Sequence, residues 1–375
     1  MNTRLEGIDL ARALAVLGMF VAHTFALYYP DVALLQIFNG RSSVLFALLA
    51  GMSVEFLTRK RRPGTSVSLL IRGLLLFVLG LSLTELPVGS MVILSTYGAL
   101  YLLVAPLAFR LPTGWLAATT LASAVGFPLF NWLIRHQLPP VPEFGWTPTW
   151  GMLFNGDYRL FIEILLFNGL FPVITWIPFF LLGMLVARLL LASQRNMATA
   201  MVVAGTIFGA AGLIMSWIVV EPLGFRTWYA SFHPEGWEAT NYLLNNAFGT
   251  PVPDVPQWLF VYVPHSGSFA EILSSSGIAV AVVGGCLLLV TPAGRVLTPL
   301  TRLGRMPLTA YTAHIIAIGL GVIMNFDLTT PFAATCNLVL PIVFAWMWFS
   351  YFKRGPLEAV LTKVAGYPSA LLIKR

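Results

Sequence analysis

The sequence predicts an all-α fold: a polytopic membrane helical bundle of about ten transmembrane helices, with both termini cytoplasmic. Of the 375 residues, 58% are hydrophobic and only 10% are charged, whereas soluble domains carry roughly 25% charged residues. The mean hydropathy is +0.82. Apolar runs of about 20 residues, long enough to cross a bilayer, recur along the chain. We therefore expect a single integral-membrane domain over residues 1–375.

Ten such runs can be placed, and the basic residues between them indicate the orientation. The predicted spans are residues 8–29, 38–58, 66–84, 89–109, 114–134, 172–191, 197–219, 268–291, 306–325 and 331–352. With both ends in the cytoplasm, all but four of the 22 basic residues lie on the inner side; the exceptions are Arg41, Arg135, Arg159 and Arg226. The net charge of +7 thus reflects membrane topology, and no nucleic-acid partner is expected.

The first span carries three ionisable side chains, Asp9, Arg12 and His23. Eleven residues separate Arg12 from His23, which returns a helix to within about 20° of the same face. Ionisable groups inside a membrane helix are costly and usually mark a pathway, a pocket or a proton-handling site. Because imidazole exchanges protons near neutral pH, His23 is the candidate acid–base group. The alternative is a buried histidine satisfied by a neighbouring hydroxyl or carbonyl.

Arg12 and Arg305 are expected near the cytoplasmic side. Arg12 either extends towards the cytoplasm while paired with Asp9, or faces the phosphates or thioester of an incoming donor. Arg305 lies at the inner end of the ninth span, which carries Tyr311 and His314 three residues apart, on one helix face and well inside the bilayer. Such groups need either a cavity or structural hydrogen bonds.

The second span combines a packing stripe with a polar outer end. Ser43, Ala47 and Gly51 recur every four residues and predict close approach of a neighbouring helix. Arg41 and Ser42 lie at its outer end, near the depth assigned to His23. Arg41 is either an interfacial side chain or a contact for an anionic or carbonyl group beside that histidine.

Two long connections, residues 135–171 and 220–267, fall on the outer side. Both are rich in proline and aromatic residues, which suit the headgroup level. They are either ordinary interfacial loops or a cover over an outward-facing substrate site. The second ends in PHSGS, where His265 and Ser266 precede a helix. A helix N-terminus attracts anions and acyl oxygens, although a simple serine cap explains the pattern equally well.

Several classes of site are not supported by the sequence. Cys286 and Cys336 both fall inside predicted spans, which indicates neither a disulfide framework nor a metal site. The chain has no Walker loop, GxSxG elbow, HExxH motif or paired-carboxylate signature. It also lacks the internal repeat common in secondary transporters.

The stretch RLEGIDLARALAVLGMFVAH resembles the opening of the transmembrane acyltransferase superfamily. In its acyltransferase-3 branch, an arginine and a histidine in the first span are separated by ten residues. Arg12 and His23 match that pattern. The resemblance implies that this histidine is the acid–base residue of acyl transfer across the membrane.

A closer resemblance is to bacterial proteins with the heparan-alpha-glucosaminide N-acetyltransferase catalytic domain. It rests on RxxxxDxxR (Arg4, Asp9, Arg12), LFALLAG, PHSGS, LGRMPLTAYTAH and the terminal RGPLE. The chain departs from this pattern at Ala13, where glycine usually follows the arginine. A second departure is His23. The resemblance implies that the heparan enzyme has an asparagine at this depth and that its own catalytic histidine comes later in the sequence.

These resemblances imply a membrane acyltransferase. An acyl group, expected to be acetyl, would pass from cytoplasmic acetyl-CoA or another acyl-CoA to a hydroxyl or amine of a sugar or lipid-linked glycan at the outer face. We assign catalysis to His23, Arg12 and Asp9, donor binding to Arg12, Arg305, Tyr311 and His314, and acceptor binding to Arg41, Ser42, His265 and Ser266. No metal is expected.

Two other functions remain open. A transporter or lipid flippase would use the intramembrane arginine and histidine as a substrate or proton path. A structural partner in an envelope assembly complex would need neither. In all three cases the protein is expected in the cell membrane, in contact with the lipid bilayer, and self-association into a homo-oligomer is left open.

Overall fold

A computed structural model describes residues 5–25, 37–60, 63–88, 92–135, 137–138, 147–192, 196–232, 236–246, 249, 251–328 and 330–373. Within these ranges the chain is helical and has no strand. In the described part of the chain, seven helices are long and apolar enough to cross a membrane. The predicted all-α membrane bundle is therefore confirmed, and the number of spans and the side of the termini stay predictions.

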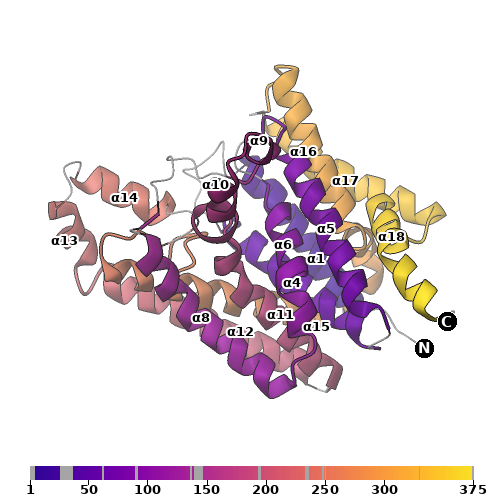
Figure 1. The fold of residues 1–375 in the computed structure, drawn as a ribbon, viewed down its shortest axis with the longest axis horizontal. Helices are drawn as coiled ribbons and strands as arrows, with labels where there is room; N and C mark the ends of the chain where they lie inside the picture. Colours follow the sequence, from indigo (N-terminus) through magenta and orange to yellow (C-terminus); the bar gives the residue numbers. More distant parts are fainter. Residues whose placement is uncertain are drawn as a thin grey trace.

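The helices follow the predicted spans in order (Figure 1). They are α1 (Glu6–His23), α4 (Arg41–Thr58), α5 (Thr65–Leu83), α6 (Leu94–Leu103), α7 (Ala105–Ala108), α8 (Thr113–Arg135), α9 (Trp150–Phe154), α10 (Tyr158–Glu163), a π-helical turn (Ile164–Asn168), α11 (Val173–Ala192), α12 (Met197–Val220), α13 (Phe225–Phe232), α14 (Gly236–Asn246), a 3₁₀ turn (Pro256–Phe260), α15 (Phe269–Leu303), α16 (Pro307–Ile323), α17 (Pro331–Tyr351) and α18 (Pro356–Ile373). Each predicted span coincides with one helix, except that 89–109 is divided between α6 and α7.

The helices differ from the prediction in several places, and the two long connections also contain helices, α9, α10, α13 and α14. α15 continues to Leu303, twelve residues past its predicted end, through Pro292 and Pro299. α18 was not expected at all. α1 ends at His23, and residues 26–36, which include the predicted end of that span, lie outside the described residues. Apolarity locates the part of a helix that suits lipid, but it does not detect polar turns that continue beyond the membrane.

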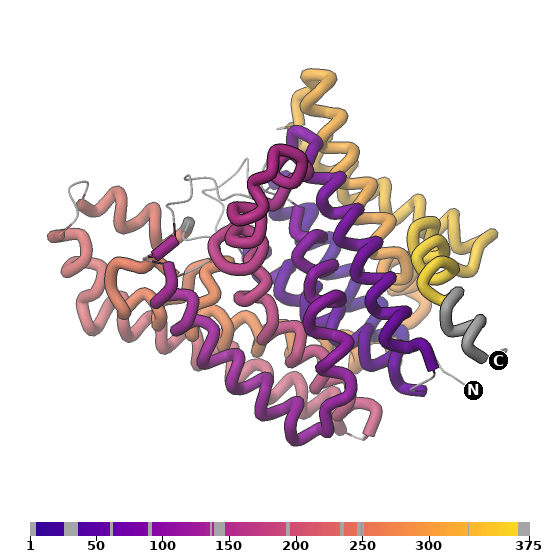
Figure 2. Tube along the Cα trace, viewed as in Figure 1, coloured from indigo at the N-terminus to yellow at the C-terminus, as the bar shows by residue number. Residues whose placement is uncertain are grey.

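Glycine allows the central helices to approach closely. A Cβ atom added to Gly51 of α4 would lie 1.9 Å from the carbonyl oxygen of Phe180, and one added to Gly183 of α11 would lie 1.9 Å from that of Leu48. The small-residue stripe of the second span is thus a packing surface, as predicted. α12 and α15 form a second close pair, which Figure 2 traces across the lower part of the molecule.

α1 lies at the centre of the arrangement that positions the site. It packs against α4 and α15 and also contacts α16 and α17. Figure 1 shows α13 and α14 at one end of the long axis and α17 and α18 at the other. The polar side chains of α1 therefore meet helices from the last third of the chain.

The second outer connection contains a small core of its own. Trp258 is 1% exposed and makes edge contacts with Phe225 and Tyr229. We expected the tryptophans of this connection at the headgroup level, but the side chain of Trp258 is buried by neighbouring aromatic rings and does not face outward. Trp228 and Trp237 are exposed. Trp146, in the first connection, lies outside the described residues.

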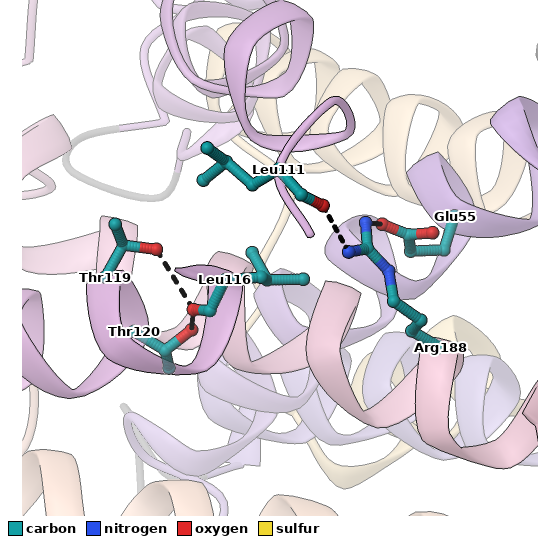
Figure 3. A network of polar contacts seen from close by, with 6 residues as sticks. All are labelled: Glu55, Leu111, Leu116, Thr119, Thr120 and Arg188. Atoms are coloured by element: carbon teal, nitrogen blue, oxygen red, sulfur yellow. Dashed lines mark hydrogen bonds and ion pairs between the residues drawn. The ribbon is translucent and has the colours of Figure 1, made fainter. Parts of the chain in front are cut away.

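An ion pair and a hydrogen bond made by one arginine join three elements at the predicted inner end of the bundle (Figure 3). Arg188 of α11 pairs with Glu55 of α4 and donates a second hydrogen bond, 2.6 Å long, to the carbonyl oxygen of Leu111 in the turn before α8. The two charged side chains are only 16% and 9% exposed. Since each neutralises the other in a largely buried setting, removing one leaves an uncompensated charge.

We expect Glu55→Gln to lower the free energy of unfolding by about 3–5 kcal/mol for that reason. The matched control is Glu221→Gln, which breaks the Arg226–Glu221 pair, whose side chains are 38% and 47% exposed. That change should cost about 0–1 kcal/mol. Thermal unfolding of the purified variants in one detergent measures both, and equal shifts would contradict a structural role for the buried pair.

Candidate functional site

Two histidines far apart in the sequence meet at the end of α1. Nδ1 of His23 lies 3.2 Å from Nε2 of His314 in α16. Nδ1 of His314 lies 3.3 Å from Oδ1 of Asn337 in α17. Phe20, one turn before His23, stacks on the His314 ring with centroids 4.0 Å apart. These contacts fix both imidazole rings in one hydrogen-bonded chain.

The orientation of the Asn337 amide sets the direction of that chain. Its Nδ2 donates to the carbonyl oxygen of Ala333 at 3.3 Å, so Oδ1 faces His314 and accepts from its Nδ1–H. Nε2 of His314 then carries a lone pair and accepts from Nδ1–H of His23. Because a neutral imidazole has one donor and one acceptor, Nε2 of His23 is left as the nitrogen that can take a proton.

A cavity of about 450 Å³ runs between α16 and α17 beside this chain. It extends from Met306 and Phe344 at one end to Phe332 at the other, and His314 and Asn337 lie on its wall. Its lining is otherwise mostly apolar, as is usual for ligand sites. His23 is not part of the wall; it reaches the cavity through its contact with His314.

The PHSGS segment adds a third histidine on the predicted outer side. His265 has a φ of +65°, which is uncommon for a residue with a side chain. Its N–H donates to Glu271 at 3.2 Å, and its carbonyl oxygen accepts from the N–H of Gly249 at 2.8 Å. The ring contacts Phe171 and Trp176. Such an over-determined backbone is typical of functional positions.

Burial lowers the pKa of His265 from 6.5 to about 4, so its imidazole is neutral at pH 7. It also interacts electrostatically with His23, which places the two rings in one region. The serine cap anticipated for this segment is present: Ser268 Oγ accepts from the N–H of Glu271 at 3.0 Å. Ser266 is 1% exposed and accepts from the N–H of Ser268.

Arg41 and Ser42 lie at the start of α4, close to the same region. The Arg41 guanidinium sits over the ring of Tyr262, 5.1 Å from its centroid, and interacts electrostatically with Glu271. A Cβ atom on Gly18 of α1 would lie 2.2 Å from Ser42 Oγ. Arg41 is thus associated with the PHSGS segment, and Ser42 with α1 five residues before His23.

At the other end of α1, Arg12 pairs with Asp9 at 2.9 Å and donates to Ser53 Oγ of α4 at 3.0 Å. Arg305 donates to the carbonyl oxygen of Lys353 at 3.1 Å, and its guanidinium lies over the ring of Phe349. The Arg12–Asp9 pair was predicted. The contacts of Arg305 with the end of α17 were not.

Tyr311 is used differently from His314, although the two are three residues apart. Its hydroxyl accepts from the N–H of Ile93 at 3.2 Å, at the start of α6. It is 2% exposed and is not among the residues that line the cavity. The structure therefore brings His23 and His314 together and turns Tyr311 towards α6.

Sequence reasoning missed Asn337 and Glu271. Both are polar residues within predicted spans, and the argument that singled out His23 applies equally to them. We did not predict their partners because those contacts cross between helices.

The matches to family models fall on both sides of this site. A model described as heparan-alpha-glucosaminide N-acetyltransferase, catalytic, matches residues 4–219, and one described as protein of unknown function (DUF418) matches residues 252–367. A search of curated proteins found no match to the chain. His23 lies in the first matched region and His314 and Asn337 in the second, so their hydrogen bonds join the two.

Proposed function

Because the chain belongs to the heparan-alpha-glucosaminide N-acetyltransferase catalytic family, we propose that it moves an acetyl group from cytoplasmic acetyl-CoA to an acceptor at the outer face of the membrane. The acceptor carries a hydroxyl or amine on a sugar or lipid-linked glycan. The observation that carries the proposal is the hydrogen-bonded His23–His314–Asn337 chain beside an apolar cavity.

His23 acts as the general base in this proposal. Nε2 takes the proton of the acceptor hydroxyl or amine as that atom attacks the thioester carbonyl carbon. The new bond to carbon forms, the carbon–sulfur bond breaks, and the departing thiolate recovers the proton from His23. His314 accepts the Nδ1–H of His23 throughout, and this contact strengthens as His23 becomes positively charged. Asn337 holds His314 in the required tautomer.

The outer polar groups are proposed to hold the acceptor. Arg41, Ser42, His265 and Ser266 come from two elements near the outer end of α1. Phe171, from the first outer connection, packs against His265, from the second. This contact supports the interpretation that the two connections cover an outward-facing substrate site. Donors of hydrogen bonds in this region would stabilise the oxyanion that forms during transfer.

The donor is proposed to enter from the inner side, near Asp9, Arg12 and Arg305. The cavity begins at Met306, one residue after Arg305, and includes His314 on the same helix. Eight residues of helix correspond to about 12 Å. An acyl-pantetheine arm laid along this wall would bring its thioester to the histidines. Tyr311 stays a candidate for donor binding, although its hydroxyl is engaged by α6.

The test is acetyl transfer by the purified protein in lipid vesicles. Acetyl-CoA is supplied on one side, and thiol release is followed with and without glucosaminides or polyprenyl-linked sugars. We expect thiol release that depends on the acceptor, with acetylated acceptor as product. If no thiol is released and the vesicles instead move labelled lipid or sugar across the bilayer, the transporter or flippase alternative replaces the enzyme.

A further inference from the structure

Two arginines from separate elements lie near Tyr101 of α6 at the predicted inner side, and a third lies near one of them. The first is Arg12 of α1. Its guanidinium donates to Ser53, and the hydroxyl of Tyr101 donates to the carbonyl oxygen of Ala50 at 3.1 Å. Residues 50 and 53 are three apart on α4 and share a helix face, so the two side chains lie next to each other along α4.

The second is Arg72 of α5. Beside it, a Cβ atom on Gly73 would lie 2.9 Å from both the carbonyl oxygen of Gly98 and the nitrogen of Leu102. α5 therefore meets α6 at the turn that carries Tyr101. Arg72 and Arg12 both interact electrostatically with the Tyr101 side chain.

The third is Arg354, in the connection between α17 and α18. Its neighbour Gly355 packs on Met306, and Gly304 in turn packs on the backbone of Asp9 and Ala13 in α1. Arg354 thus lies close to the first two arginines, and it interacts electrostatically with Arg72. We call Arg12, Arg72 and Arg354 the inner arginine cluster.

The carboxylates around the cluster do not balance its charge. Asp9 pairs with Arg12 and Glu55 with Arg188. Glu358 accepts from the backbone N–H groups of Leu308 and Thr309 and from the Thr309 hydroxyl.

Within the described ranges of the chain, neither Arg72 nor Arg354 forms an ion pair. The Nε of Arg72 is buried and has no hydrogen-bond partner there. Lys353 and Arg305 add further positive charge nearby. A half-buried guanidinium beside other cations favours an anionic partner.

We propose that the inner arginine cluster binds the phosphate groups of the donor's nucleotide, a deeper assignment that rests on the proposed acetyl transfer. Planar guanidinium groups bind phosphate oxygens in pairs, and several of them suit a ligand with more than one phosphate. The cluster borders the inner end of the cavity, because Gly355 contacts Met306, which lines it. Phosphates held here leave the pantetheine arm free to follow the cavity towards His314.

The experiment measures binding of coenzyme A, without turnover, to protein in neutral phosphatidylcholine nanodiscs. Arg72→Gln and Arg354→Gln should each weaken binding about 10- to 100-fold, the loss typical of one or two charge-assisted hydrogen bonds. The control is Arg110→Gln, which should bind as the parent does. Arg110 lies in the connection before α8, and its guanidinium donates to Ser66 of α5. Pantetheine, which lacks the phosphates, should bind the parent and all variants equally.

Each outcome separates this proposal from the proposed function. Coenzyme A binding that is unchanged in both variants, in samples that elute as folded protein, overturns the phosphate assignment and leaves acetyl transfer untouched. A parent that binds coenzyme A through these arginines but releases no thiol from acetyl-CoA supports the assignment and contradicts the proposed function. A third arm uses phosphatidylglycerol, whose headgroup also offers a phosphate. It compares how much of this lipid the purified parent and the two arginine variants retain. Loss of this lipid, with coenzyme A affinity unchanged, makes the cluster a lipid site and overturns the donor assignment.

Discussion

His23→Ala is expected to lower the rate of acetyl transfer by about 10²–10⁴-fold, the usual contribution of a general base. The variant loses the nitrogen that takes the acceptor proton and leaves Nε2 of His314 without its donor. The matched control is Thr24→Ala, because the Thr24 hydroxyl donates only to Phe20 of its own helix, at 2.6 Å. Thiol release and product formation in lipid vesicles measure both variants.

Added imidazole offers a second readout for the same variant. A small base that enters the space left by the His23 ring should restore part of the lost rate, whereas it should not affect the Thr24→Ala variant. If His23→Ala retains transfer within about tenfold of the parent, the general-base contribution of this residue is excluded.

His314→Ala is expected to lower the maximal rate by a comparable factor, about 10²–10⁴-fold, because His314 orients the proton-accepting histidine. Groups that act as one unit give non-additive losses. The double variant His23→Ala/His314→Ala should therefore be no slower than the slower single variant. Thr335→Ala is the control and should retain the parent rate, because the Thr335 hydroxyl donates to the carbonyl oxygen of Pro331 in its own helix, at 2.7 Å, and does not line the cavity. Losses that multiply in the double variant would show that the two histidines act independently.

What the sequence could predict depends on how local each contact is. The Arg12–Asp9 pair joins residues three apart on one helix, and helical periodicity alone predicts it. The contact between His23 and His314 joins residues 291 positions apart. Periodicity places each ring on a face of its own helix, but it carries no information on which helices lie together.

The same limit explains the errors in the fold. Each of the ten apolar runs coincides with helical chain, because lipid selects for apolar side chains. The final turns of α15 and the whole of α18 have more mixed composition, so apolarity did not reveal them. Trp258 resembles an interfacial tryptophan in the sequence, and only the packing of Phe225 and Tyr229 shows that it belongs to a small core.

The two helices that carry the histidines are short. α1 has 18 residues and α16 has 17, which correspond to about 27 Å and 26 Å, whereas the hydrocarbon layer of a typical bilayer is about 30 Å thick. As the membrane spans that the sequence predicts, they would require the lipid to thin around them or water to enter at their ends, and the energy of that mismatch would change with acyl-chain length. In the proposed enzyme, the thickness of the membrane would thereby change the depth at which an acceptor meets the imidazoles.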